Sequence, residues 1–246
     1  MNISVRPKSL LVALLSIMAF LIAAHLTMYF VVNVGGNVGL SWLRRIFHVD
    51  FENNIPTWFS SCLLLFAALL LFVIAADEKK RGSRFFRQWK FLAFLFIGLS
   101  IDEMSSIHEE LIRPLRDFFG ASGLFFYTWV VAGLALVAVV ALYCFRWFWQ
   151  LPARTRALSG AAAILFVGGA IGTEMVGGYV QYNNMPGFTL HTTAEEVLEM
   201  TGAILWIYAL ADYAKNRITL NISFDGQGKS MTPAASGPSA GAVQPR

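Results

Sequence analysis

The sequence predicts an all-α membrane protein: a polytopic bundle of about six transmembrane helices with both termini in the cytoplasm. The first observation behind this prediction is composition, since 57% of the 246 residues are hydrophobic and only 14% are charged. These fractions lie well outside the averages of soluble domains. The second observation is the length of the apolar runs, and the third is the placement of lysine and arginine between them.

Six apolar segments are long enough to cross the hydrocarbon core of a bilayer, which takes about 20 helical residues. We expect them at Leu10–Val32, Trp58–Ala76, Trp89–Ile112, Leu124–Trp149, Ala157–Val180 and Thr193–Tyr213. The first is too long for the apolar region of a signal peptide, so we expect a retained helix. The fifth is rich in glycine, and Gly168 with Gly172 forms a small-xxx-small pair that predicts close helix packing there.

Basic residues alternate between dense and sparse loops, which sets the expected orientation. One side of the membrane would hold Arg6, Lys8, Lys79, Lys80, Arg81, Arg84, Arg87, Lys90, Arg146, Arg154, Arg156, Lys215 and Arg217. The other side would hold only Arg44, Arg45, Arg113 and Arg116. Lysine and arginine concentrate in cytoplasmic loops, so both termini are predicted to be cytoplasmic.

The domain organisation is expected to be simple. Residues 1–220 would form the transmembrane bundle, and residues 221–246, rich in Gly, Ser, Pro and Ala, would form a disordered cytoplasmic tail. The net charge of +4 concentrates in short loops, which favours contact with anionic membrane lipids and not with nucleic acid. We expect the protein to be integral to the bacterial cytoplasmic (inner) membrane. The sequence leaves its oligomeric state open.

Acidic residues and histidines interrupt the third, fifth and sixth segments, and these interruptions carry the functional hypothesis. The candidates are Asp102, His108, Glu109, Glu174, His191, Glu195 and Glu199. In a continuous third helix, Asp102 and Glu109 would share one face, with His108 at its edge. In the sixth, His191, Glu195 and Glu199 would share another.

Height across the membrane predicts that some of these side chains meet. A helical rise of about 1.5 Å per residue puts Asp102 about 18 Å, Glu174 about 24 Å and Glu199 about 21 Å above the cytoplasmic end of the bundle. His25 of the first helix falls at about 22 Å. A carboxylate at such depth costs at least about 2.5 kcal/mol on insertion scales, so these groups should face the interior of the bundle.

Several acidic residues also have purely structural explanations. Thr192-x-x-Glu195 and Thr193-x-x-Glu196 both match a capping box at the start of the sixth helix. Glu103 and Glu110 are expected to be solvated or paired with arginine near the end of the third helix. A lone histidine on an apolar helix, such as His25, is most often a hydrogen-bonded core residue.

The residue types favour a metal-dependent membrane enzyme, hydrolase-like, acting on an amphipathic or lipid substrate. Carboxylate oxygens and imidazole nitrogens together suit a divalent transition metal such as Zn, Mn or Fe. All seven candidates are predicted metal ligands, and Asp102, Glu174 and Glu199 are also the candidate catalytic carboxylates. Two alternatives stay open: a proton- or cation-coupled transporter or channel, and a non-catalytic membrane assembly subunit whose acids pair with a partner.

Reporter fusions test the orientation on which the heights depend. A phosphatase fused to the C-terminus should be inactive and a fluorescent protein bright, because the positive-inside rule places this end in the cytoplasm. A phosphatase inserted between the fifth and sixth segments should be active. A C-terminal reporter that is active outside would reverse every predicted height.

Overall fold

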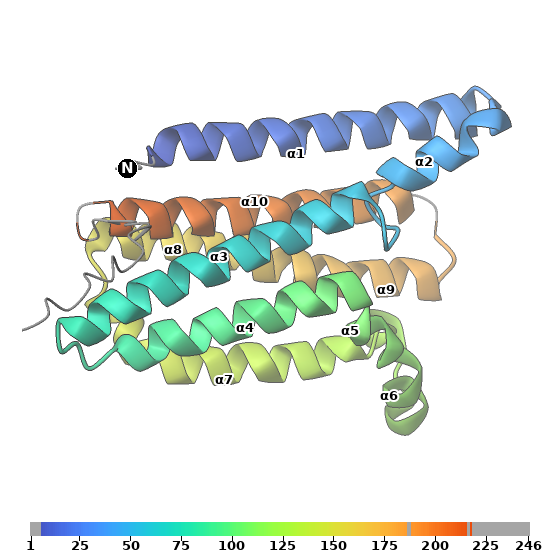
Figure 1. Cartoon of the computed structure of the whole chain (residues 1–246). Coiled ribbons are helices and arrows are strands. Elements are labelled where there is room, and N and C mark those ends of the chain that lie inside the picture. The colour runs from blue at the N-terminus through green and yellow to red at the C-terminus, as the bar shows by residue number, and fades with distance from the viewer. Residues whose placement is uncertain (1–5, 186–187, 216, 218–246) are drawn as a thin grey trace, which may run out of the picture. The chain divides into compact units, whose positions relative to one another are not determined.

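The fold is a bundle of long apolar helices, as the sequence predicts. The computed structural model describes residues 6–185, 188–215 and 217, and these contain helices, turns and loops but no strand (Figure 1). In chain order the α-helices are α1 (Pro7–Tyr29), α2 (Ser41–Phe47), α3 (Ile55–Lys80), α4 (Phe86–Ser105), α5 (Ile107–Glu110), α6 (Ile112–Phe119), α7 (Trp129–Gln150), α8 (Ala153–Val167), α9 (Glu174–Tyr182) and α10 (Phe188–Ala214). The expected tail over 221–246 lies outside the described residues.

Five helical stretches in the described chain are long and apolar enough to span a membrane. They are Pro7–Val34, Ile55–Lys80, Trp129–Gln150, Ala153–Tyr182 and Thr189–Ala214. The first continues from α1 through a π-helical turn, η1 (Phe30–Val34), and the fourth joins α8 to α9 through a second one, η4 (Gly168–Thr173). Two single turns of 3₁₀ helix, η2 (Val38–Leu40) and η3 (Gly123–Phe125), lie in the connections. The protein is therefore an integral membrane helix bundle.

The third predicted span is broken, and here the prediction of a continuous helix over Trp89–Ile112 was wrong. Helix α4 ends at Ser105, Ser106 takes a left-handed conformation with φ of 50°, and the chain leaves at an angle of 70° through α5 and α6. Counted as one span, this pair gives the sixth crossing. The bend removes α5 and α6 from the axis of α4, so a helical periodicity cannot be carried past Ser106 (Figure 1).

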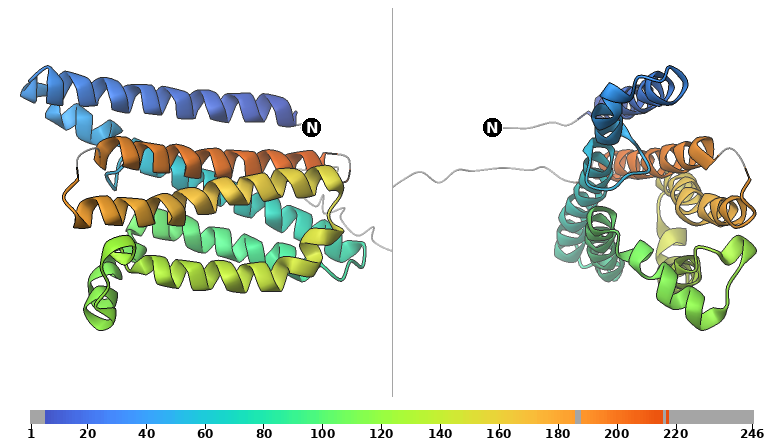
Figure 2. Two further views of the ribbon diagram at one scale, coloured as in Figure 1. Left: turned by 180° about the vertical axis from the view of Figure 1, so that it is seen from behind. Right: turned by 90° about the vertical axis from the view of Figure 1, so that its right-hand side faces the viewer.

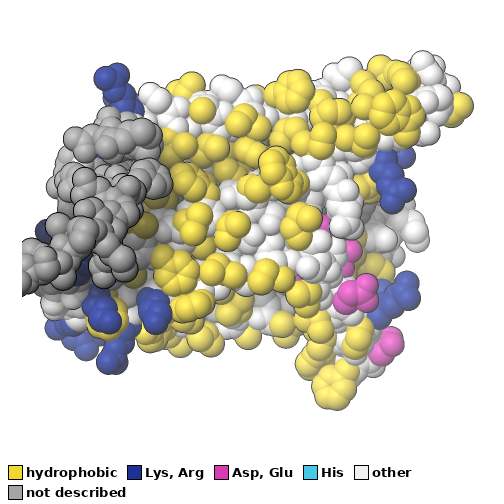
Figure 3. Space-filling model, in the orientation of Figure 1, with side chains coloured by type: hydrophobic (Ala, Val, Ile, Leu, Met, Phe, Trp, Pro, Cys, Tyr) yellow, Lys and Arg dark blue, Asp and Glu magenta, His cyan; other side chains and the backbone are white. Residues whose placement is uncertain are grey.

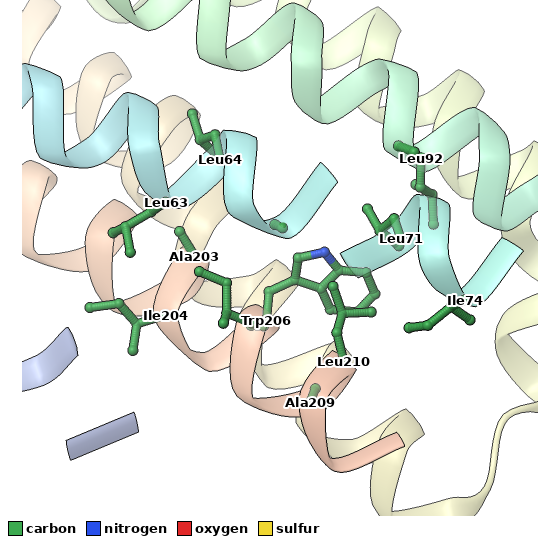
Figure 4. Packing of buried hydrophobic residues seen from close by; sticks show 14 of the residues in the cluster. Leu63, Leu64, Leu71, Ile74, Leu92, Ala203, Ile204, Trp206, Ala209 and Leu210 are labelled. Atoms are coloured by element: carbon green, nitrogen blue, oxygen red, sulfur yellow. The ribbon is translucent and has the colours of Figure 1, made fainter. Parts of the chain in front are cut away.

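The apolar core lies between α3, α4 and α10, mainly in the half of the bundle that holds the α3–α4 turn. Leu63, Leu71 and Ile74 of α3 pack against Ile204 and Leu210 of α10, and all five are almost fully buried (Figure 4). At the same end Trp89 is fully buried, with its ring 4.8 Å from that of Trp147 and 5.1 Å from that of Tyr213. These contacts tie α4, α7 and α10 together.

Charge is distributed unevenly over the two ends of the bundle. Lysine and arginine gather at the end that holds the α3–α4 turn, whereas the acidic side chains visible in Figure 3 lie at the opposite end. We call the end that holds the α3–α4 turn the basic end. Acidic residues described there have cationic partners: Asp212 pairs with Arg154 at 3.0 Å and Lys215 at 2.5 Å, and Glu78 with Arg217 at 3.3 Å. We call the opposite end, with loop 48–54, the acidic end.

Glycines let α10 approach α8 and η4 closely, but they are not the pair that the sequence suggested. A Cβ on Gly168 or Gly172 would meet nothing within 4 Å, so the expected packing role of this pair was wrong. The close contacts are at Gly169, whose Cβ would lie 2.8 Å from Glu199 Cγ, and at Gly202, whose Cβ would lie 2.6 Å from the Phe166 amide nitrogen. The π-helical turn shifts the face that the fifth span presents, which periodicity alone does not reveal.

Substitution of Gly202 by alanine should destabilise the bundle. The added methyl group would collide with backbone atoms of Phe166, which cannot rotate away. Overpacking of this kind costs about 1–3 kcal/mol, so the Tm in detergent should fall by several degrees. Gly172→Ala is the matched control, since its Cβ meets open space and alanine favours the helix. Equal Tm values for the two variants would contradict this packing.

Candidate functional site

One large cavity of about 860 Å³ lies among α3, α4, α7, α8, η4 and α10. Asp50 of loop 48–54 lines it and is exposed, which places a mouth of the cavity at this loop. The acidic end of the cavity is lined by nine carboxylic acids and two histidines: Asp50, Glu52, Asp102, Glu103, Glu109, Glu174, Glu195, Glu196, Glu199, His108 and His191. No lysine or arginine is among the described residues that line it. All seven side chains predicted from the sequence are therefore around one cavity.

Four of the acidic lining residues were not predicted as site residues. Asp50 and Glu52 belong to the loop between α2 and α3, where no helical period could place them. Glu103 and Glu196 were expected to be solvated and capping residues, respectively, and both expectations were wrong because both side chains line the cavity. Glu110, in contrast, is exposed and lies outside the lining.

The capping explanation failed because α10 begins earlier than the sequence suggests. The helix starts at Phe188, so Thr192 and Thr193 are interior residues whose hydroxyl groups donate to the Thr189 carbonyl. Glu195 and Glu196 therefore lie beyond the first turn, where the backbone amides already have partners within the helix. Their carboxyl groups are left to the cavity.

Asp102 and His108 form a pair across the break in the third span. One Asp102 oxygen accepts the His108 backbone N–H at 3.0 Å, and the other lies 2.9 Å from His108 Nδ1. The predicted common helical face of Asp102 and Glu109 does not exist, because the left-handed Ser106 separates them. The same break turns His108 back toward Asp102, so a local backbone distortion builds the contact.

Trp129, at the start of α7, connects this pair to the fifth span. Its ring centroid lies 4.8 Å from that of His108, and its indole N–H donates to Glu174 Oε1 at 3.0 Å. Glu174 is the first residue after the π-helical turn η4, which ends at Thr173. The tryptophan thus holds groups from two spans at a fixed separation, and nothing in the sequence distinguishes it from the other six tryptophans.

His191 is fixed by the fifth span. Its Nε2 lies 2.5 Å from the Thr173 carbonyl oxygen, so this nitrogen donates and Nδ1 keeps its lone pair. Gly177 makes room for the ring, since a Cβ there would lie 2.9 Å from His191 Nε2. One helical turn further along α10, Glu195 neighbours Glu174. The acidic residues of α9 and α10 consequently face each other directly.

His25 is the core histidine that the sequence suggested. It is 1% exposed, its Nε2 lies 3.1 Å from Thr193 Oγ1, and its Nδ1 accepts the Val49 amide N–H at 3.4 Å. It is not part of the cavity lining. Its contacts attach loop 48–54 to α1 and α10, which positions Asp50 and Glu52 over the cavity.

The carboxyl groups at the cavity mouth repel one another. Loss of hydration and the neighbouring Glu109, Glu174 and Glu52 raise the pKa of Asp50 to about 6. Loss of hydration, then Glu109, raises the pKa of Glu52 above its ordinary value, and one of its oxygens is buried without a hydrogen-bond partner among the described residues. Arg116 of α6 does not neutralise them, since it donates to the Phe126 carbonyl at 2.8 Å.

As the side chains stand, the predicted ligands do not converge on one point. No three His, Cys, Asp or Glu side chains within the described ranges are arranged to hold a metal ion. The structure therefore gathers the seven predicted residues around one cavity without forming a coordination sphere, and both oxygens of Asp102 are engaged by His108.

The fold and the cavity define the class: an integral membrane helix bundle with an internal, acid-lined cavity. Within that class, the chain belongs to a family described as a domain of unknown function (DUF8692), whose profile matches residues 12–213. The match covers every span from α1 to α10. Comparisons with curated proteins and with solved structures gave no match.

Removal of the charge of Asp50 should stabilise the protein in a pH-dependent way. A carboxyl group whose pKa is raised on folding penalises the folded state above its folded pKa, here about 6, and not below its unfolded pKa. Asp50 is exposed and solvent screens part of this repulsion, so Asp50→Asn should raise the Tm by only about one degree at pH 7.5, and the difference should vanish toward pH 4.

Asp117→Asn is the control for this measurement, because Asp117 is an exposed carboxylate of α6 outside the cavity lining. Its Tm difference from wild type should stay small at both pH values. A stabilisation by Asp50→Asn that is the same at pH 7.5 and pH 4 would show that repulsion at the cavity mouth is not its cause.

Proposed function

We propose that this protein is a membrane enzyme that acts on an amphipathic, lipid-like substrate with the help of a divalent transition-metal ion bound at the acidic end of the cavity. The observation that carries the proposal is the composition of the cavity. Nine carboxylic acids and two histidines line it without a lysine or arginine among the described lining residues. Such a set attracts a cation, and its oxygen and nitrogen donors match Zn, Mn or Fe.

Two histidines are prepared as ligands by their hydrogen bonds. Donation from His108 Nδ1–H to Asp102 leaves Nε2 free, and donation from His191 Nε2–H to the Thr173 carbonyl leaves Nδ1 free. Metal-binding histidines characteristically have this second hydrogen bond, which fixes the tautomer and the ring orientation. Asp102 would therefore orient His108, and Glu174, Glu195 and Glu199 would serve as carboxylate ligands or bases.

Binding requires the carboxylate side chains to rotate toward a shared ion. Glutamate side chains have three rotatable bonds, and the cavity gives them free volume. When bound, the ion would supply Lewis acidity that polarises a substrate carbonyl or a water molecule. A carboxylate outside the coordination sphere would accept the proton of the attacking water and return it to the leaving group as the substrate bond breaks.

The distribution of polar groups favours an enzyme over a transporter. A proton or cation pathway needs polar groups through both halves of the membrane. Here the carboxylates line only the acidic end, whereas the remainder of the cavity is lined mainly by Leu, Val, Ala, Phe and Trp side chains. A substrate with a polar head and an apolar tail fits this distribution better than a hydrated ion.

Metal content tests the proposal. Protein purified from metal-replete cells should contain about one equivalent of a transition metal, and Glu199→Gln or His191→Ala should lower its metal affinity by at least about tenfold. Because protons compete with the metal for the ligand groups, affinity should also fall as the pH is lowered.

Glu110→Gln is the matched control, since Glu110 is an exposed glutamate outside the cavity lining. It should bind metal as the wild type does. Protein that holds no stoichiometric metal after metal-replete expression, or variants that all bind equally, would overturn the metal-dependent mechanism.

A further inference from the structure

The half of the cavity away from the carboxylates is apolar and elongated. Leu95 and Leu99 of α4, Val137 and Ala141 of α7, and Ala163 and Phe166 of α8 are among its lining residues. Along α7 the lining runs from Trp129 to Trp149, which at a helical rise of 1.5 Å per residue is about 30 Å. This length matches the hydrocarbon thickness of a bilayer, so the cavity runs parallel to the lipid chains.

Helix α7 is held to the bundle at its two ends and covers the cavity between them. At the acidic end Trp129 contacts His108 and Glu174. At the basic end the Trp147 ring packs against Trp89, and the Tyr143 ring lies 4.9 Å from that of Phe91. The right-hand view of Figure 2 shows α7 set apart from the helices that form the core. The middle of α7 therefore forms a wall of the cavity facing α4 and α8.

We propose that this apolar half binds the hydrocarbon chain of a long-chain amino amphiphile, in which an ammonium group lies beside the bond to be hydrolysed and is held among the carboxylates. The inference rests on the proposed function and names the substrate class for the same cavity. Aliphatic side chains from three helices favour an alkyl chain that is removed from water. The whole lining, about 30 Å long, accommodates the head group and one extended chain together, aligned as they would be in the membrane.

The charge of the lining selects the head group. An ammonium group gains charge-assisted hydrogen bonds from carboxylates such as Glu195 and Glu199. A phosphate or carboxylate head would meet nine acidic side chains without a basic residue among the described lining residues. Like charges in a site of low dielectric repel strongly, so anionic amphiphiles should bind poorly. One bound divalent ion would still leave most of these carboxylates without a countercharge.

Photoaffinity labelling of the full-length protein in neutral lipid vesicles tests the proposal. The probe is a long-chain alkyl amine with a diazirine near the end of its chain, and the comparison probe is the carboxylic acid of the same length. The amine should label peptides of α7 and α8 around Cys144 and Ala162, whereas the acid should label them about tenfold less. Equal labelling by both probes, or amine labelling no higher than that of a lipid-facing peptide of α1, would overturn the proposal.

Two tryptophan substitutions on α8 provide a matched pair. Ala163 lines the cavity, whereas Ala161 is exposed outside it. Ala163→Trp should reduce amine labelling about tenfold by filling the volume that the chain would occupy, and Ala161→Trp should not. Ala141→Phe, from the opposite wall on α7, should act as Ala163→Trp does. Labelling that is unchanged in both cavity variants would refute the chain site.

Metal analysis of the same samples separates this proposal from the proposed function. Ala163→Trp protein that retains its metal and loses labelling supports the chain site at an intact centre. Labelling that depends on Ala163 in protein without stoichiometric metal would support the chain site and overturn the metal-dependent mechanism. The Tm of each variant is compared with that of Ala161→Trp. If Ala163→Trp or Ala141→Phe has a lower Tm, only the other cavity variant is used, so that loss of fold is not mistaken for loss of binding.

Discussion

The structure depends on one constraint: carboxyl groups at membrane depth cannot face lipid. Transfer of such a group into hydrocarbon costs several kcal/mol unless it is paired, protonated or in contact with water. The acidic residues in the acidic-end halves of three spans satisfy the constraint together, since seven of them line one cavity: Asp102, Glu103, Glu109, Glu174, Glu195, Glu196 and Glu199. The apolar core is correspondingly displaced toward the opposite end, between α3, α4 and α10.

Two backbone irregularities make this arrangement possible. The left-handed Ser106 ends α4 and brings His108 onto Asp102, and the π-helical turn before Glu174 changes the face that the fifth span turns toward α10. A serine in this conformation is unfavourable on its own, and π-helical turns are rare and frequently occur at functional sites. Their occurrence on both sides of the same cavity indicates that the backbone is adapted to the acidic residues.

The sequence predicts the helix bundle and most of the acidic residues that line the cavity, but it does not predict the contacts among those residues. Apolar runs depend only on composition and length, so the spans could be placed. The similar heights of Asp102, Glu174 and Glu199 predicted that residues from three helices line a common region. The contacts could not be predicted, because Ser106 and η4 interrupt the helical period on which faces are calculated. The loop that carries Asp50 and Glu52 has no helical period, and its position is set by the hydrogen bond of its Val49 with His25, a residue of the distant helix α1.

The acidic residues at the two ends of the bundle differ in whether they are paired with basic residues. At the basic end, Asp77, Glu78 and Asp212 each pair with arginine or lysine, so the chain has cations available and uses them to neutralise structural carboxylates. At the acidic end, Asp102 pairs with His108, and none of the other lining carboxylates is in an ion pair within the described residues. Carboxylates with a purely structural role would be expected to pair with arginine or lysine, as they do at the basic end. Their uncompensated state, in a cavity that continues into an apolar channel, is what a site for an external cation and an alkyl chain requires.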